Sequence, residues 1–333
     1  MPHSITLSKI TWSTPDGHTL LSDLDLTFGH ERAGLVGRNG VGKTTLLKLV
    51  TGALAPQAGT VTVEGTLGLL RQSVQVGPQE TIASLFGIAE ALALLARAAR
   101  GEAGAEELAE ADWTLEARLE AALARVGLDA PPDTPLVALS GGQRTRAGLA
   151  ALVFRAPDFL LLDEPTNNLD REGRRAVIDM LAGWRAGALV VSHDRELLEI
   201  MDTIAELAKL GATRYGGNWS VYRARKALEL AAAHRDLADA EKHADEVART
   251  AQAVAERKAR KDSAGRRKRA KGDIPRIMLG AMKERSELTG GANARLAENR
   301  QAQAAGAMAA ARERIEILQP LTVSVPPTHL PAS

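Results

Sequence analysis

The sequence of 333 residues contains no cysteine, and only 3% of its residues are aromatic. Without cysteine the chain can form neither disulfide bonds nor thiolate metal sites, which fits a reducing compartment. It contains no run of eighteen apolar residues, and residues 1–5 do not lead into the apolar region of a signal peptide. We therefore expect a cytoplasmic protein without direct membrane insertion, whose 45% apolar content allows one large core.

The net charge is only +1, but it is distributed unevenly along the chain. Residues 223–315 contain 22 Lys and Arg against 13 Asp and Glu, whereas the rest of the chain contains 20 against 28. A basic segment attached to an acidic one indicates a polyanionic partner for the basic part. The basic side chains are densest at Arg257, Lys258, Arg260, Lys261, Arg266, Arg267, Lys268, Arg269 and Lys271.

Residues 37–44 read Gly-Arg-Asn-Gly-Val-Gly-Lys-Thr, which fits the phosphate-loop pattern GxxxxGK[ST]. An apolar strand is expected just before this loop and a helix just after it, which is the context that the pattern requires. Lys43 is expected to reach the β- and γ-phosphates of ATP, and the Thr44 hydroxyl to hold Mg²⁺. The rest of the phosphate cradle is expected to consist of Gly37, Asn39, Gly40, Gly42 and Thr45.

Two adjacent carboxylates, Asp163 and Glu164, follow the apolar run at residues 159–162. The residue at the carboxyl end of a buried parallel strand lies at the sheet edge where ligands bind. We therefore expect Asp163 to bind Mg²⁺. We expect Glu164 to polarise the attacking water, because phosphoryl transfer depends on positioning and charge stabilisation. A buried acid with a purely structural partner is the alternative for each.

The order of these motifs resembles that of ATP-binding cassette proteins. The chain also has Leu-Ser-Gly-Gly-Gln at residues 139–143 and Val-Ser-His-Asp-Arg at 191–195. The segments Asp-Glu-Pro-Thr-Asn-Asn-Leu-Asp at 163–170 and Tyr-Gly-Gly-Asn-Trp-Ser at 215–220 look like the F subfamily, the soluble, translation-associated branch. The resemblance covers roughly residues 1–315. Two features depart from it: Asn168 stands where that subfamily usually has His, and one cassette is present where two are usual.

The resemblance implies roles for further residues. Gln72 would reach Mg²⁺ and the attacking water, and His193 would contact the γ-phosphate. Trp12 would stack on adenine, with core packing as its alternative. In cassettes the glycine-rich segment at 140–143 binds the γ-phosphate held by an opposing domain, so a second cassette or a second copy of the chain is an expected partner. That segment consists of Ser140, Gly141, Gly142 and Gln143.

The expected fold is an α/β P-loop NTPase cassette with a helical subdomain, followed by an antiparallel α-helical hairpin. The cassette is expected at residues 1–222, with the helical subdomain at about 80–138. The basic hairpin is expected at 223–318, and residues 319–333 resemble the start of a second cassette. Heptad repeats of mostly small apolar residues predict the two helices, with a break at Gly290 and Gly291. The repeats comprise Leu230, Ala233, Leu237, Ala240, Ala244, Val247, Ala251 and Val254, then Ala297, Ala304, Met308, Ala311 and Ile315.

The function implied is an ATPase that hydrolyses ATP to switch its binding to the ribosome, in translation regulation or ribosome protection. The basic residues would contact phosphates of rRNA or tRNA, because residues 223–318 contain no aromatic side chain that could stack on bases. Solvated surface, or a localisation signal at residues 266–269, is the alternative for this charge. Two other functions stay open: an ATPase subunit acting with separate membrane subunits of a transporter, and a truncated RNA-binding module with little turnover.

Overall fold

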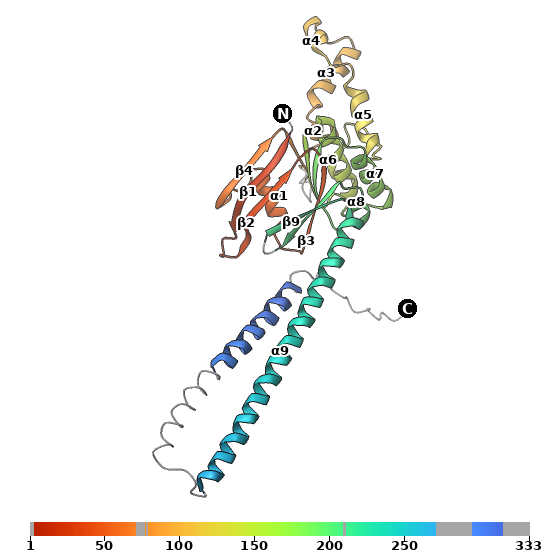
Figure 1. Cartoon of the computed structure of the whole chain (residues 1–333). Coiled ribbons are helices and arrows are strands. Elements are labelled where there is room, and N and C mark those ends of the chain that lie inside the picture. The colour runs from red at the N-terminus through yellow and green to blue at the C-terminus, as the bar shows by residue number, and fades with distance from the viewer. Residues whose placement is uncertain (1–2, 71–76, 78, 209–210, 271–294, 316–333) are drawn as a thin grey trace, which may run out of the picture. The chain divides into compact units, whose positions relative to one another are not determined.

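A computed structural model describes residues 3–70, 77, 79–208, 211–270 and 295–315 (Figure 1). The chain divides into two compact units, Met1–Arg223 and Ala224–Ser333. The first is an α/β unit and the second is helical in its described part. None of the helices within the described ranges has the length and apolar character needed to cross a membrane.

A three-stranded antiparallel sheet in the order β2-β1-β4 opens the first unit. Along β2, buried Leu24, Leu26 and Phe28 alternate with exposed residues, as expected for a sheet that packs one face on a core. Apolar and polar residues also alternate in the sequence along residues 4–10 and 19–28. The strands of this sheet are β1 (Ser4–Ser13), β2 (Thr19–Phe28) and β4 (Ala58–Glu64).

A six-stranded sheet in the order β5-β6-β7-β3-β8-β9 forms the centre of the unit. All its pairs are parallel except β8 with β9. Every residue of β6 and β7 is buried, since helices and the second sheet cover both faces. The bounds are β3 (Arg32–Gly37), β5 (Leu67–Leu70), β6 (Phe159–Asp163), β7 (Gly187–Val191), β8 (Thr203–Ala208) and β9 (Gly211–Gly216).

Two apolar clusters lie on opposite faces of this sheet. Along β6, Phe159 and Leu161 join a cluster with the antiparallel sheet and α1 (Lys43–Val50). Leu160 and Leu162 join the other cluster, formed with helices of the opposite layer. Those helices are α2 (Ile82–Phe86), α3 (Ala89–Ala99), α5 (Leu115–Arg125), α6 (Gly141–Arg155), α7 (Arg171–Ala182) and α8 (Arg195–Glu199). The mixed α/β architecture predicted from the sequence is confirmed.

Several short helices form the region of about 80–138 where a helical subdomain was expected. Gly87 ends α2 in the left-handed conformation (φ 75°), and α3 starts two residues later. Between α4 (Ala105–Glu110) and α5, Asp112 accepts hydrogen bonds from the backbone N–H (3.0 Å) and the hydroxyl (2.6 Å) of Thr114. This local turn competes with helix, as short polar side chains commonly do. Gly101 and Gly104 lie between the end of α3 and the start of α4.

The second unit contains most of α9 (Trp219–Ala270) and a helix at residues 295–315. Ion pairs of 3.0 Å join Asp236 to Arg314 and Glu241 to Arg312. Residue numbers rise along one helix as they fall along the other, so the helices are antiparallel and the predicted hairpin is confirmed (Figure 1).

The seam between the two helices follows the heptad prediction at most positions. Ala233, Ala304 and Ile315 are buried, whereas Val254 is 56% exposed although the repeat places it in the seam. The cluster of basic residues that begins at Arg257 belongs to the last turns of α9 as far as Arg269. Lys271 and the predicted break at 290–291 lie outside the described residues.

Gly187 tests how tightly the central sheet is packed. A β-carbon there would lie 2.1 Å from Cε1 of Phe159, whose buried ring has no free space to enter. We expect Gly187→Ala to destabilise the first unit by about 1–3 kcal/mol, as overpacked cores do. Chemical denaturation measures this. Gly216→Ala is the control, because no atom of the described residues lies within 4 Å of its added β-carbon. Equal destabilisation by both variants would contradict the prediction.

Candidate functional site

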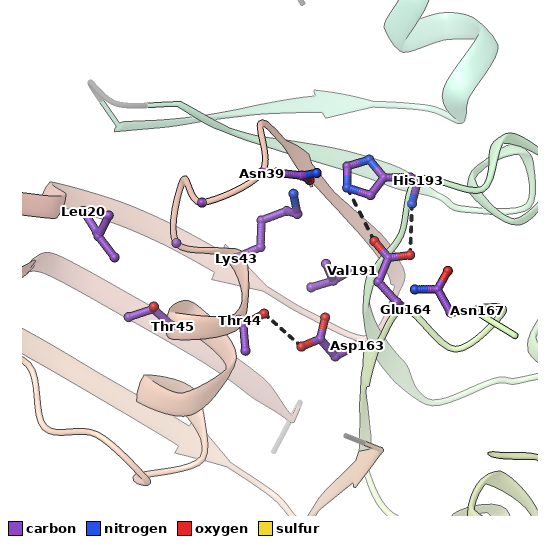
Figure 2. A pocket seen from close by; sticks show the side chains of 12 residues that line it. Leu20, Asn39, Lys43, Thr44, Thr45, Asp163, Glu164, Asn167, Val191 and His193 are labelled. Atoms are coloured by element: carbon purple, nitrogen blue, oxygen red, sulfur yellow. Dashed lines mark hydrogen bonds and ion pairs between the residues drawn. The ribbon is translucent and has the colours of Figure 1, made fainter. Parts of the chain in front are cut away.

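A cavity of about 480 Å³ lies where the carboxyl ends of β6 and β7 meet the loop that follows β3 (Figure 2). In a parallel sheet this edge is the usual place for a ligand, because the loops there converge. The cavity is lined by Leu20, Asn39, Gly40, Gly42, Lys43, Thr44, Thr45, Asp163, Glu164, Asn167, Val191 and His193.

The loop before α1 forms one wall of the cavity. Gly42, at the N-cap of α1, has φ 109°, a conformation that favours glycine. At Gly37 a β-carbon would lie 2.4 Å from the backbone oxygen of Leu207, so only glycine allows this approach. Among the described residues no side chain caps α1 and no acid occupies its first turn. The first N–H groups of α1 thus suit an anion such as phosphate.

Lys43 is the cation of this wall. Its Nζ donates to the backbone oxygens of Gly37 (2.7 Å) and Arg38 (3.2 Å), which holds the side chain along the loop. Burial lowers the pKa of Lys43, while the negative charges of Glu164 and Asp163 oppose this shift. A phosphate in the cavity would therefore give a desolvated ammonium group a direct anionic partner.

Thr44 and Asp163 lie side by side in the wall of the cavity, with their side chains pointing toward each other (Figure 2). The Thr44 hydroxyl donates to Oδ2 of Asp163 over 3.0 Å, and Asp163 is buried. A hydroxyl and a carboxylate are hard oxygen ligands, and Mg²⁺ characteristically binds few protein oxygens together with phosphate and water. The two residues therefore fit a Mg²⁺ ion that is shared with a nucleotide.

Glu164 and His193 form the opposite wall. The backbone N–H of His193 donates to Oε2 of Glu164 (3.4 Å), and its Nε2 lies 3.5 Å from Oε1. Desolvation raises the pKa of Glu164, and burial together with the charge of Lys43 lowers the pKa of His193. Glu164 has φ 51°, and its N–H donates to the oxygen of Val191 (2.9 Å). A strained, partly desolvated carboxylate is typical of a functional position.

A protein-family model described as ABC transporter matches residues 21–167, which include the phosphate loop and both carboxylates. The chain is also 35% identical over 232 residues to the energy-coupling factor transporter ATP-binding protein EcfA2 of Symbiobacterium thermophilum. That match covers 77% of EcfA2 and 65% of this chain. The chain belongs to the ATP-binding cassette family. Members of this family are ATPases whose cassettes bind ATP, typically with Mg²⁺.

Two further relatives are longer than this chain. It is 36% identical over 242 residues to the tylosin resistance ATP-binding protein TlrC of Streptomyces fradiae, covering 64% of this chain and 44% of TlrC. It is 34% identical over 268 residues to the energy-dependent translational throttle protein EttA of Mycobacterium tuberculosis, covering 72% of this chain and 47% of EttA. The matched region therefore spans less than half the length of either protein.

The fold of the cassette is also that of solved ATP-binding cassettes. The dimeric, post-hydrolysis structure of the cassette MJ0796 with ADP and Pi superimposes with a TM-score of 0.51 at 20% identity. The superposition covers 64% of this chain and 98% of MJ0796.

The structure brings together many of the residues that the sequence predicted for this cassette site. Asn39, Gly40, Gly42, Lys43, Thr44, Thr45, Asp163, Glu164 and His193 all line the cavity. Gly37 lies at the base of the loop. Residues 140–143 lie at the N-terminus of α6, and Trp12 lies on β1 partly packed against the core; neither is among the described lining residues. Gln72 lies outside the described residues. The roles of all these residues stay predictions.

Three lining residues were not predicted from the sequence. Asn167 lies three residues after Glu164, within the motif at 163–170, and its N–H donates to the backbone oxygen of Glu164 (3.1 Å), so the motif could have indicated it. Val191 is the last residue of β7, and the apolar run there could have indicated it too. Leu20 comes from β2 and reaches the cavity only through tertiary packing, which no local pattern reveals.

Mutation can separate the predicted role of Glu164 in water activation from that of Lys43 in nucleotide binding. We expect Glu164→Gln to keep ATP affinity and to lower turnover by about 10²-fold or more, because the loop, Lys43 and the Thr44–Asp163 pair stay intact. Lys43→Ala is expected to weaken ATP binding instead. Nucleotide titration and steady-state phosphate release measure the two effects. Wild-type turnover by Glu164→Gln would show that another group activates the water.

Proposed function

We propose that this chain is an ATPase of the F-subfamily type whose ATP hydrolysis switches its binding to the ribosome. The extent of the match to EttA carries the proposal. The match covers 72% of the 333 residues of this chain. This is a larger number of residues than the 223 of the first unit, so the match includes part of the helical unit. The match to EcfA2 covers 65%, which is fewer residues than the first unit contains.

The surface of α9 supports RNA as the partner. Arg257, Lys258, Arg260 and Lys261 are all exposed and lie within five consecutive residues of the helix. Their ammonium and guanidinium groups suit phosphates, and residues 223–318 offer no aromatic side chain for stacking on bases. Recognition through backbone and shape, as in structured rRNA or tRNA, is therefore the expected mode.

The position of Ser140 supports a composite ATP site. This residue caps α6 by accepting the N–H of Gln143 (3.2 Å), and it is not among the described residues that line the cavity containing Lys43. We infer that the N-terminus of α6 serves a nucleotide held by a second cassette, in another copy of the chain or in another protein. ATP would then hold two cassettes together, and hydrolysis would release them.

A transporter ATPase subunit is the second candidate, favoured by the coverage of EcfA2. Sedimentation distinguishes the candidates. Glu164→Gln protein with Mg²⁺ and ATP is expected to sediment with ribosomes, because nucleotide that is not consumed prolongs the bound state. Recovery with membranes and not with ribosomes would favour the transporter role. A truncated RNA-binding module predicts ribosome binding that does not depend on nucleotide.

Removing the exposed charge on α9 tests the RNA contact. Replacing Arg257, Lys258, Arg260 and Lys261 with Gln is expected to weaken ribosome binding by about 10-fold or more and to flatten its salt dependence, because fewer counterions are released. ATP binding is expected to stay unchanged.

A charge-matched control replaces four exposed basic residues of the cassette. These are Lys48, Arg125, Arg171 and Arg185, each changed to Gln. If this control and the α9 variant lose affinity equally, net charge explains the effect and the α9 surface is not the contact.

A composite site also predicts that activity depends on protein concentration. If the N-terminus of α6 in each copy completes the nucleotide site of the other copy, specific activity is expected to rise with protein concentration as the dimer forms. ATP with Glu164→Gln is expected to stabilise that dimer. Phosphate release and light scattering across a dilution series measure both. Full-rate hydrolysis by a strict monomer would rule out the composite site for this chain.

A further inference from the structure

Helix α9 is held at its first turn by one carboxylate from α8. Glu199, the last residue of α8, accepts the backbone N–H of Ser220 at Oε2 (3.1 Å). Its Oε1 accepts Nδ2 of Asn218 (3.0 Å), and Oδ1 of Asn218 accepts the N–H of Val221 (3.2 Å). The first N–H groups of a helix have no partner inside it, so these contacts fix where and how α9 begins.

The other end of α8 adjoins the nucleotide site. Asp194, directly after His193, is the N-cap of α8 and accepts the N–H groups of Glu196 (3.0 Å) and Leu197 (3.3 Å). Its side chain is only 7% exposed and forms an ion pair with Arg174 of α7. A helix of five residues thus connects the histidine that contacts Glu164 with the carboxylate that holds α9.

Aromatic packing joins the first turn of α9 to β9. Tyr215 and Tyr222, the only tyrosines of the sequence, have ring centroids 5.1 Å apart, and Trp219 lies 5.2 Å from Tyr222. Nε1 of Trp219 is buried and has no hydrogen-bond partner in the described part of the chain. A buried donor without a partner is unfavourable, so this arrangement is less stable than its apolar contacts alone would make it.

We propose that Glu199 is a positioning residue that transmits the state of the nucleotide site to α9. Bound nucleotide would replace Glu164 as the partner of His193. Asp194 and α8 would then move with His193. Because Glu199 is hydrogen-bonded to Asn218 and Ser220, the first turn of α9 would be displaced together with α8. The link itself lies within the first unit. Its consequence, a ribosome affinity that depends on nucleotide, rests on the proposed function.

Hydrogen exchange tests the link without ribosomes. The nucleotide-induced change in exchange is measured for the amides of residues 219–222, with and without Mg²⁺ and a non-hydrolysable ATP analogue. Wild type is expected to show a change of about threefold or more, and Glu199→Gln a change below about half of that. Ser220 and Asn218 each donate a hydrogen bond to one carboxylate oxygen of Glu199. In glutamine an NH₂ group replaces one of these oxygens and cannot accept, so one of the two hydrogen bonds is lost. Affinity for the analogue is expected to stay within about twofold of wild type.

Glu196→Gln is the matched control. It removes a carboxylate from the same helix, but Glu196 lies 3.5 Å from Arg174 and is 74% exposed. It is expected to behave as wild type. No nucleotide-induced change in wild type, or an equal change in Glu199→Gln, would overturn the proposal.

Ribosome sedimentation separates this link from the proposed function. Glu199→Gln is expected to bind ribosomes with similar affinity in ADP and in the analogue, whereas wild type binds more tightly in the analogue. Suppose that wild type shows a nucleotide-induced change in hydrogen exchange that depends on Glu199, but binds no ribosomes. The link then stands and the proposed function is wrong. If ribosome binding depends on nucleotide equally in both proteins, the function stands and the link is wrong.

Discussion

The hydrogen bond from Thr44 to Asp163 joins residues that are 119 positions apart in the sequence, and the rest of the site depends on their meeting. Thr44 is carried by α1, and Asp163 ends β6. They can meet only because β7 pairs in parallel with both β6 and β3, which brings the carboxyl ends of all three strands to one edge. The register of the buried strands thus sets the distance between the phosphate loop and the acidic pair.

The sequence predicted what local chemistry determines. Apolar runs, and apolar residues that alternate with polar ones, predicted strands, and the spacing of glycines around Lys43 predicted the phosphate loop. Strand and loop are predictable in this way because residues that are neighbours in the sequence satisfy their backbone requirements. The exposure of Val254 was not predicted, because a heptad repeat shows which residues are apolar and not which of them a partner helix covers. Leu20 reaches the cavity by folding of one sheet over another, which is a property of the whole unit.

Different kinds of interaction stabilise the hairpin and the first turn of α9. Alanines buried in the hairpin seam remove little apolar surface from water, and its two ion pairs are exposed, so each contributes only about 0–1 kcal/mol. The first turn of α9 has the aromatic contacts of Trp219 and two hydrogen bonds to Glu199. The first turn of α9 is therefore held by large apolar side chains and direct hydrogen bonds, whereas the seam is held by small side chains and exposed charges.

Asn168, which departs from the usual F-subfamily residue, lies where its conformation matters. It has φ 61°, a region that asparagine adopts more readily than most residues. Its backbone oxygen would lie 3.0 Å from a β-carbon at Gly142, so the loop after Glu164 touches the N-terminus of α6. Movement of the acidic loop beside one nucleotide would therefore displace the α6 terminus of the same cassette. In the proposed composite site that terminus would face the other nucleotide, so this contact would connect the two sites physically.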